Sequence, residues 1–117
     1  MDRLRQGRQA LNRNGASTEP IWVTEFGWAS GGQSSPFTVG ESQQAANLDQ
    51  TYGSLLANRG YYRLLGATWF AFKDHRRAAG QDPYWGFNTG LLRLDGSAEP
   101  AWAGSPGGRS TGVGRLF

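Results

Sequence analysis

Two apolar runs constrain the fold of this chain more than any other feature of its sequence. Residues 21–26 and 64–72 are rich in β-branched and aromatic side chains, and both alternating faces of each run are apolar almost to its end. This pattern predicts two strands buried on both faces, which is typical of a parallel sheet. One helix is predicted between them, as the crossover between parallel neighbours requires. The sequence therefore predicts a right-handed β-α-β unit.

The connecting helix is the longest one predicted. It extends from Glu41 to Arg59, with a Thr38/Glu41 capping box before it and Gly60 as its stop. One face of this helix is apolar and is formed by Ala45, Leu48, Tyr52, Leu55 and Leu56. Two shorter helices are predicted. The first covers residues 1–14, and the second begins within residues 98–102.

The predicted elements leave the fold incomplete. A chain of 117 residues is long enough for one small domain. Strands buried on both faces need further strands beside them and helices over them, and three predicted helices supply too little cover. We therefore expect the chain to assemble with other chains or to be the end of a larger barrel or open sheet. Alone, it is expected to fold poorly, because an open sheet edge and apolar faces stay exposed.

The charge distribution bears on nucleic acid as a partner. The formal net charge is +3, from 12 Lys and Arg residues against 9 Asp and Glu residues. Basic residues cluster only near the start of the chain, at Arg3, Arg5, Arg8 and Arg13. A solvated helix face accounts for this cluster better than a nucleic-acid interface does.

Composition also bears on metal sites and membranes. The chain has no cysteine and a single histidine, His75, so thiolate zinc sites, disulfides and a histidine-built metal centre are not expected. No run approaches the roughly 18 apolar residues of a membrane span, and no signal-peptide core follows Met1. Membrane is not an expected partner, and the localisation stays undetermined.

Glu25 is the main candidate for chemistry. It lies near the end of the first strand, and ligands collect at the carboxyl ends of strands in α/β folds. Gly27 permits a sharp turn, and Trp28 adds a flat apolar face to the same rim. A carboxylate among aromatic rings is typical of sugar chemistry, in which the charge meets an oxocarbenium-like transition state. A carboxylate that forms a salt bridge or a cap is the alternative interpretation.

Asp74 follows the second strand as Glu25 ends the first. Neighbouring strands lie about 4.8 Å apart, so this pair could approach the roughly 5–5.5 Å of a retaining glycosidase. We favour a structural role for Asp74, because the cations Lys73, Arg76 and Arg77 beside it suit an ion pair better than a general acid. His75 has no Ser or Asp constellation around it and is interpreted as a loop residue.

The ordered set of three segments resembles the C-terminal end of a clan-A retaining glycoside hydrolase, a (β/α)₈ barrel. Residues 20–28 are similar to its seventh strand, and residues 66–74 to its eighth. Residues 90–102 resemble the closing segment, with a Gly-Leu-Leu run, an Asp-Gly turn and a Pro-Ala pair before the last helix. The resemblance covers residues 1–102, about the last quarter of a barrel of roughly 250 residues. Residues 103–117 are predicted to form a Gly-rich disordered tail.

This resemblance implies roles for individual residues. Glu25 matches the family's nucleophile, and Trp69 is favoured over Phe70 and Phe72 as the sugar-stacking aromatic of the eighth strand. Trp28 and Trp85 are predicted to bind substrate at the rim. The substrate class is a polysaccharide or glycoside, and no cofactor or metal is required. The family's acid/base, a Glu after Asn on the fourth strand, has no counterpart here, because the sequence contains no Asn-Glu pair.

The isolated chain is therefore expected to be inactive and to have the missing remainder of the barrel as its partner. Two other functions stay open. One is a non-catalytic carbohydrate-binding or interaction fragment, and the other is a small basic nucleic-acid-binding domain that uses the arginine cluster.

Overall fold

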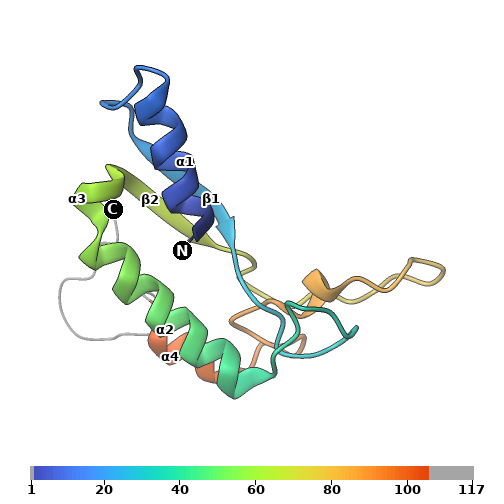
Figure 1. Cartoon of the computed structure of the whole chain (residues 1–117). Coiled ribbons are helices and arrows are strands. Elements are labelled where there is room, and N and C mark those ends of the chain that lie inside the picture. Colours follow the sequence, from blue (N-terminus) through green and yellow to red (C-terminus); the bar gives the residue numbers. More distant parts are fainter. Residues whose placement is uncertain (1, 106–117) are drawn as a thin grey trace.

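The computed structural model describes residues 2–105, and these form a mixed α/β structure (Figure 1). Four α-helices, two strands and one 3₁₀ helix follow one another as α1 (Asp2–Arg13), β1 (Ile21–Phe26), α2 (Glu41–Ala57), α3 (Arg59–Tyr62), β2 (Leu64–Trp69), η1 (Trp85–Asn88) and α4 (Pro100–Gly104). Residues 103 and 104 of the predicted tail belong to α4, and residues 106–117 lie outside the described residues.

The β-α-β unit predicted from the two apolar runs is confirmed. β1 and β2 pair in parallel, with α2 in the connection between them. The second strand ends at Trp69, three residues before the predicted end. Beyond the end of β2 the chain lies beside the closing segment, residues 90–102. Lys73 forms an isolated bridge with Leu92, and Leu92 forms a second one with Ala98.

The core lies on one side of this sheet. Leu48, Tyr52 and Leu55 of α2 are buried against Leu64 and Trp69 of β2. Leu91 and Ala101 of the closing segment complete the buried cluster, and α4 packs along α2. Burial of each large apolar side chain contributes roughly 1.5–3 kcal/mol, so this one-sided core is the main stabilising feature of the chain.

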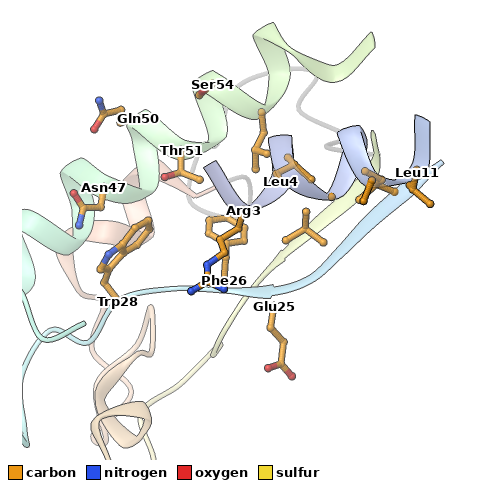
Figure 2. A pocket seen from close by; sticks show the side chains of 15 residues that line it. Arg3, Leu4, Leu11, Glu25, Phe26, Trp28, Asn47, Gln50, Thr51 and Ser54 are labelled. Atoms are coloured by element: carbon orange, nitrogen blue, oxygen red, sulfur yellow. The ribbon is translucent and has the colours of Figure 1, made fainter. Parts of the chain in front are cut away.

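The prediction that both strands are buried on both faces is wrong. Trp22 is 58% exposed and Leu65 is 50% exposed, whereas Val23 and Leu64 pack into the core. In Figure 2 the blue helix α1 and the green helix α2 lie on the same side of β1. Among the described residues no layer covers the other side of the sheet, which we call the open face.

Details of the connecting helix also differ from the sequence prediction. The capping box is absent: Gly40 precedes α2 without a side-chain cap, and Thr38 donates its hydroxyl hydrogen to the Gln33 carbonyl instead. Glu41 is drawn away by Arg93, whose guanidinium forms a bidentate ion pair with it at 2.6 and 2.9 Å. A carboxylate in a fork-to-fork pair with arginine cannot also reach back to the helix end.

The end of the helix also lies elsewhere than predicted. α2 stops at Ala57, and Gly60 lies inside the short helix α3. The apolar face is confirmed for Leu48, Tyr52 and Leu55 but is wrong for Leu56, which is exposed. Leu56 lies inside α2 at the margin of this face, and Tyr62 of α3 joins the core instead.

Arg8 is the most buried charged residue of the described chain. It is 2% exposed, and its guanidinium donates hydrogen bonds to the carbonyls of Ser17, Glu19 and Tyr62 at 3.3, 2.5 and 2.9 Å. It thus fastens α1 to the following loop and to α3. The solvated helix face predicted for the arginine cluster is therefore wrong for Arg8, whereas Arg3, Arg5 and Arg13 are exposed. No helix within residues 2–105 is long and apolar enough to cross a membrane.

Candidate functional site

A β-bulge near the end of β1 determines where Glu25 points. Val23 pairs with Ala67 and Phe26 pairs with Trp69, so two residues of β1 oppose the single residue Thr68 on β2. In a regular strand, side chains three residues apart point to opposite faces, so Val23 and Phe26 would lie on different sides of the sheet. Because of the bulge, both side chains face the core. Thr24 and Glu25 are consequently both exposed. A bulge of this kind re-aims a side chain, here the carboxylate of Glu25.

Glu25 points to the open face of the sheet. Figure 2 shows its carboxylate directed away from α1 and α2, while Phe26 points toward these helices. A cavity of about 980 Å³ lies on the helix side, lined mainly by apolar side chains, and Glu25 only borders it. Glu25 lies next to the last residue of β1, at the carboxyl end of the strand, and the bulge turns its side chain to the open face. The face that would hold a substrate is open within the described residues.

Gly27 permits a close approach of chains just beyond Glu25. A Cβ atom at this position would collide with the carbonyl oxygen of Phe70, because the Phe70 N–H donates to the Phe26 carbonyl at 2.9 Å. The glycine therefore serves the pairing of the strand ends rather than a sharp turn. This contact holds the chain directly after Phe26 against the segment that follows β2.

Trp69 and Trp28 lie on the helix side of the sheet. Trp69 is 8% exposed, its indole N–H donates to the Thr89 carbonyl at 2.9 Å, and its ring contacts Phe26 edge-on. Trp28 is half-buried and lies 6.1 Å from Trp69, centroid to centroid. In Figure 2 the Trp28 ring and the Glu25 carboxylate point in opposite directions. The structure does not bring these rings beside the carboxylate, and their contact with sugar stays a prediction.

Trp85 lies within the predicted loop segment, where the structure forms the short 3₁₀ helix η1. It begins η1, is half-buried, and its ring centroid is 5.0 Å from that of Phe37 and 5.3 Å from that of Tyr84. The latter two were not singled out from the sequence. The sequence signal for Phe37 and Tyr84 was their place in Gly- and Pro-rich segments, where an aromatic side chain has little core to enter.

Asp74 is held by the backbone. It is buried, and its Oδ1 accepts the Gly90 N–H at 2.8 Å. This hydrogen bond fits a structural carboxylate. Position 90 requires glycine for a separate reason, because a Cβ there would lie 2.6 Å from the Leu92 carbonyl oxygen.

Glu99 is a buried carboxylate that the sequence analysis missed. It is 3% exposed, its Oε1 accepts a hydrogen bond from Ser30 at 3.0 Å, and its Oε2 has no partner among the described residues. Burial raises the pKa of Glu99 to about 7, and the negative charges of Asp74 and Glu41 add to this effect against the Ser30 hydrogen bond and the charge of Arg93. Its sequence signal was weak, because a Glu before Pro at a helix start is usually exposed.

These carboxylates do not form a metal centre. Asp74, Glu99 and Glu41 border a shallow pocket of about 380 Å³, which Arg93 also lines. Within residues 2–105 no group of three or more His, Cys, Asp and Glu residues has the arrangement needed to hold a metal ion.

Comparisons with known proteins do not identify the chain. No family model, no curated protein and no solved structure matches it. What the structure shows is a mixed α/β chain with a two-stranded parallel sheet. The resemblance to glycoside hydrolases stays a prediction that depends on the three sequence segments alone.

Proposed function

We propose that this chain is the C-terminal quarter of a (β/α)₈ barrel of a retaining glycoside hydrolase, and that Glu25 is its nucleophile. The observation that carries the proposal is the bulge that turns Glu25 to the open face at the carboxyl end of a parallel strand. In such a barrel the helices lie outside and this face lies inside, where catalytic residues come from the strand ends. β1 and β2 would be the seventh and eighth strands.

The reaction follows from a carboxylate in that position. Glu25 attacks the anomeric carbon as the leaving-group oxygen departs, and a covalent glycosyl-enzyme forms. A second carboxylic acid first protonates the leaving oxygen and then, as the carboxylate, takes a proton from the water that hydrolyses the intermediate. That acid/base belongs to the missing part of the barrel, because Asp74 is occupied by the Gly90 N–H. Sugar contact by Trp28, Trp69 and Trp85 stays a prediction from the resemblance, because Trp28 and Trp69 lie on the helix side of the sheet, away from the Glu25 carboxylate.

The exposed surfaces of this chain call for a partner. Within the described residues β1 and β2 pair only with each other, so the outer edge of each strand presents unpaired backbone groups. Trp22 and Leu65 add exposed apolar surface on the open face. The missing remainder of the barrel would pair with both edges and cover this face. The chain alone is then proposed to be inactive.

The test uses a longer polypeptide, in which the residues encoded in frame before Met1 are joined to this chain. We expect that polypeptide to hydrolyse a polysaccharide or an aryl glycoside and the chain alone to hydrolyse neither. Glu25→Ala is expected to abolish hydrolysis, because no nucleophile remains. Added azide is expected to restore bond cleavage in Glu25→Ala and to give a glycosyl azide of inverted configuration, since the small anion enters the space of the carboxylate.

The matched control is Glu19→Gln, which neutralises another exposed glutamate of the same loop and strand region. It should retain full activity. Hydrolysis that survives Glu25→Ala without azide would overturn the proposal, as would stop codons in all frames directly before Met1.

A carbohydrate-binding fragment without catalysis is the second candidate. The exposed rings of Phe37 and Tyr84 beside Trp85 favour it, because they require no catalytic partner to contact a sugar. Sugar binding that is unaffected by any change at Glu25, in a longer polypeptide with no hydrolytic activity, would favour this candidate over the first.

A further inference from the structure

The loop after β1, residues 27–40, is fastened to segments far away in the sequence. The Ser30 N–H donates to the Asn88 carbonyl at 2.7 Å, and the Ser30 hydroxyl contacts the carboxyl group of Glu99 at 3.0 Å. Figure 1 shows this loop beside the segment that leads into α4. One serine thus links the loop that follows the strand of Glu25 to η1 and to the start of α4.

The hydroxyl of Ser30 has more acceptors around it than hydrogens. Its Oγ contacts Oε1 of Glu99 at 3.0 Å and the carbonyl oxygen of Asn88 at 3.2 Å. A hydroxyl carries one hydrogen and two lone pairs. When Glu99 is ionised, its carboxylate and the carbonyl compete for that hydrogen. When Glu99 is protonated, its hydrogen goes to the Ser30 oxygen and the Ser30 hydrogen goes to Asn88, so both contacts are satisfied.

The surroundings of Glu99 also favour its protonated form. The residue is 3% exposed, and its Oε2 has no hydrogen-bond partner among the described residues. A negative charge at this place would lack the donors that stabilise a buried carboxylate. Burial, together with nearby carboxylates, raises the pKa of Glu99 to about 7.

The charged groups that face Glu99 line the same shallow pocket: Asp74 after β2, Glu41 at the start of α2, and Arg93 and Asp95 in the closing segment. Three of these four groups are carboxylates. The fourth, Arg93, forms its bidentate ion pair with Glu41. Ionisation of Glu99 would therefore add negative charge to a pocket that is already acidic.

We propose that protonated Glu99 and Ser30 form a proton-dependent clasp between the loop after β1 and the start of α4. The clasp is closed while the carboxyl hydrogen joins Glu99 to Ser30, and loss of that proton weakens it. All of its contacts lie within the described residues, so the clasp does not depend on the proposed function. It goes beyond that function, because it makes the hold on the loop that follows Glu25 depend on pH.

The direction of the pH effect follows from proton binding. With the clasp closed, the pKa of Glu99 is about 7, whereas in an opened loop the carboxyl group meets water and returns toward its ordinary pKa of 4.5. Between these values the closed form binds more protons than the opened form. Opening therefore becomes more favourable as the pH rises through this range, and the effect levels off above about pH 7.

The experiment is amide hydrogen exchange of the chain, alone or within the longer polypeptide, measured by NMR at about pH 5.5 and about pH 8. Protection factors remove the intrinsic effect of pH on exchange. The amides to follow are those of Ser30 and Glu99, which donate to the carbonyls of Asn88 and Leu91. We expect the protection of both to be roughly tenfold lower at the higher pH, because opening then releases an ionised carboxylate to water.

Two substitutions separate the clasp from burial of Glu99 alone. Glu99→Gln keeps a hydrogen to donate to Ser30 at every pH, so both amides should be equally protected at the two pH values. Ser30→Ala removes the connection, so the amide of residue 30 should lose its pH response while that of Glu99 keeps it. Ser30→Thr, which keeps a hydroxyl, should retain the response at both positions.

Ser34→Ala is the matched control, because Ser34 is an exposed serine of the same loop. It should leave the pH response unchanged. Circular dichroism of each variant checks that the helices are retained. The carboxyl ¹³C chemical shift of Glu99, followed across the same pH range, reports its protonation directly and should show the neutral acid at about pH 5.5.

Four results would overturn the clasp. They are an ionised Glu99 at the lower pH, equal protection of the Ser30 amide at both pH values, a full pH response at residue 30 in Ser30→Ala, and loss of the response in Ser34→Ala. The third result would show that burial of Glu99 acts without Ser30, and the fourth would show that the loop responds to any change of serine.

Discussion

Replacement of Glu99 by glutamine should change how the stability of the chain depends on pH. Glu99 is 3% exposed where α4 begins, and only one of its carboxylate oxygens has a partner, Ser30. Burial disfavours its charged form and raises the pKa from 4.5 to about 7. The groups that face it are Asp74 after β2, Glu41 at the start of α2, and Arg93 in the closing segment, and the two carboxylates outweigh the arginine.

The sign of the effect follows from proton binding. Between about pH 4.5 and pH 7 the folded chain keeps the Glu99 proton, while the unfolded chain has lost it. The folded state then binds more protons, so the free energy of unfolding decreases as the pH rises through this range and levels off above it. The full difference in pKa corresponds to about 3 kcal/mol at 1.36 kcal/mol per pKa unit. This is an upper limit, because the pocket beside Glu99 admits water.

Urea denaturation across this pH range measures the effect. Glu99→Gln keeps a hydrogen-bond acceptor for Ser30 and removes the titrating group. We expect its unfolding free energy to lose the decrease between about pH 4.5 and pH 7 and to exceed that of the unaltered chain above pH 7. Glu19→Gln, at an exposed position, should keep the decrease. The same pH dependence in Glu99→Gln and in the unaltered chain would show that Glu99 does not titrate in this range.

Two further predictions concern the packing that holds the strands. Arg8→Met should lower the free energy of unfolding by roughly 3 kcal/mol or more, because three carbonyls lose a charged donor. Arg13→Met, at an exposed position, should change this free energy little. Equal effects of the two substitutions in chemical denaturation would contradict the prediction. Gly90→Ala should lower the free energy of unfolding by roughly 3 kcal/mol, because the added Cβ would collide with the backbone of Lys73 and Leu92. Gly53→Ala, inside α2 with open space around it, should instead stabilise the chain by roughly 0.5–1 kcal/mol. Thermal melts measure both variants, and a stabilising Gly90→Ala would show that the close approach of Gly90 to Lys73 and Leu92 is absent.

The strands and their pairing could be predicted from local sequence. β-branched and aromatic residues mark β1 and β2, and the helix between them leaves a parallel arrangement as the natural one. The burial of Leu48, Tyr52 and Leu55 on one face of α2 follows from helical spacing in the same way. Properties that depend on spacing within one element were therefore accessible.

Features that depend on the meeting of distant residues were not accessible. The capping box at Thr38 and Glu41 has the right spacing, yet Arg93, 52 residues away from Glu41, captures the carboxylate. The bulge that turns Glu25 to the open face arises from how β1 aligns with β2, and no local pattern marks it. Glu99 looks like an ordinary surface residue until Ser30 and the start of α4 enclose it.

The position of the aromatic side chains was the least predictable part of the candidate site. Trp69 and Phe72 both suit an exposed position at the end of the second run, but Trp69 is buried with a bonded indole N–H and Phe72 is exposed. The choice depends on the Thr89 carbonyl, which the chain brings back beside β2. Sequence spacing alone carries no information about that return.

The most direct test of Glu25 as a nucleophile is covalent trapping. The polypeptide extended upstream of Met1 is incubated with an activated 2-deoxy-2-fluoro glycoside, whose fluorine slows hydrolysis of the glycosyl-enzyme more than its formation, and its peptides are then analysed by mass spectrometry. We expect one added fluorosugar on the peptide that contains Glu25, and none in Glu25→Gln. A polypeptide that hydrolyses glycosides but carries the label on another residue would contradict it.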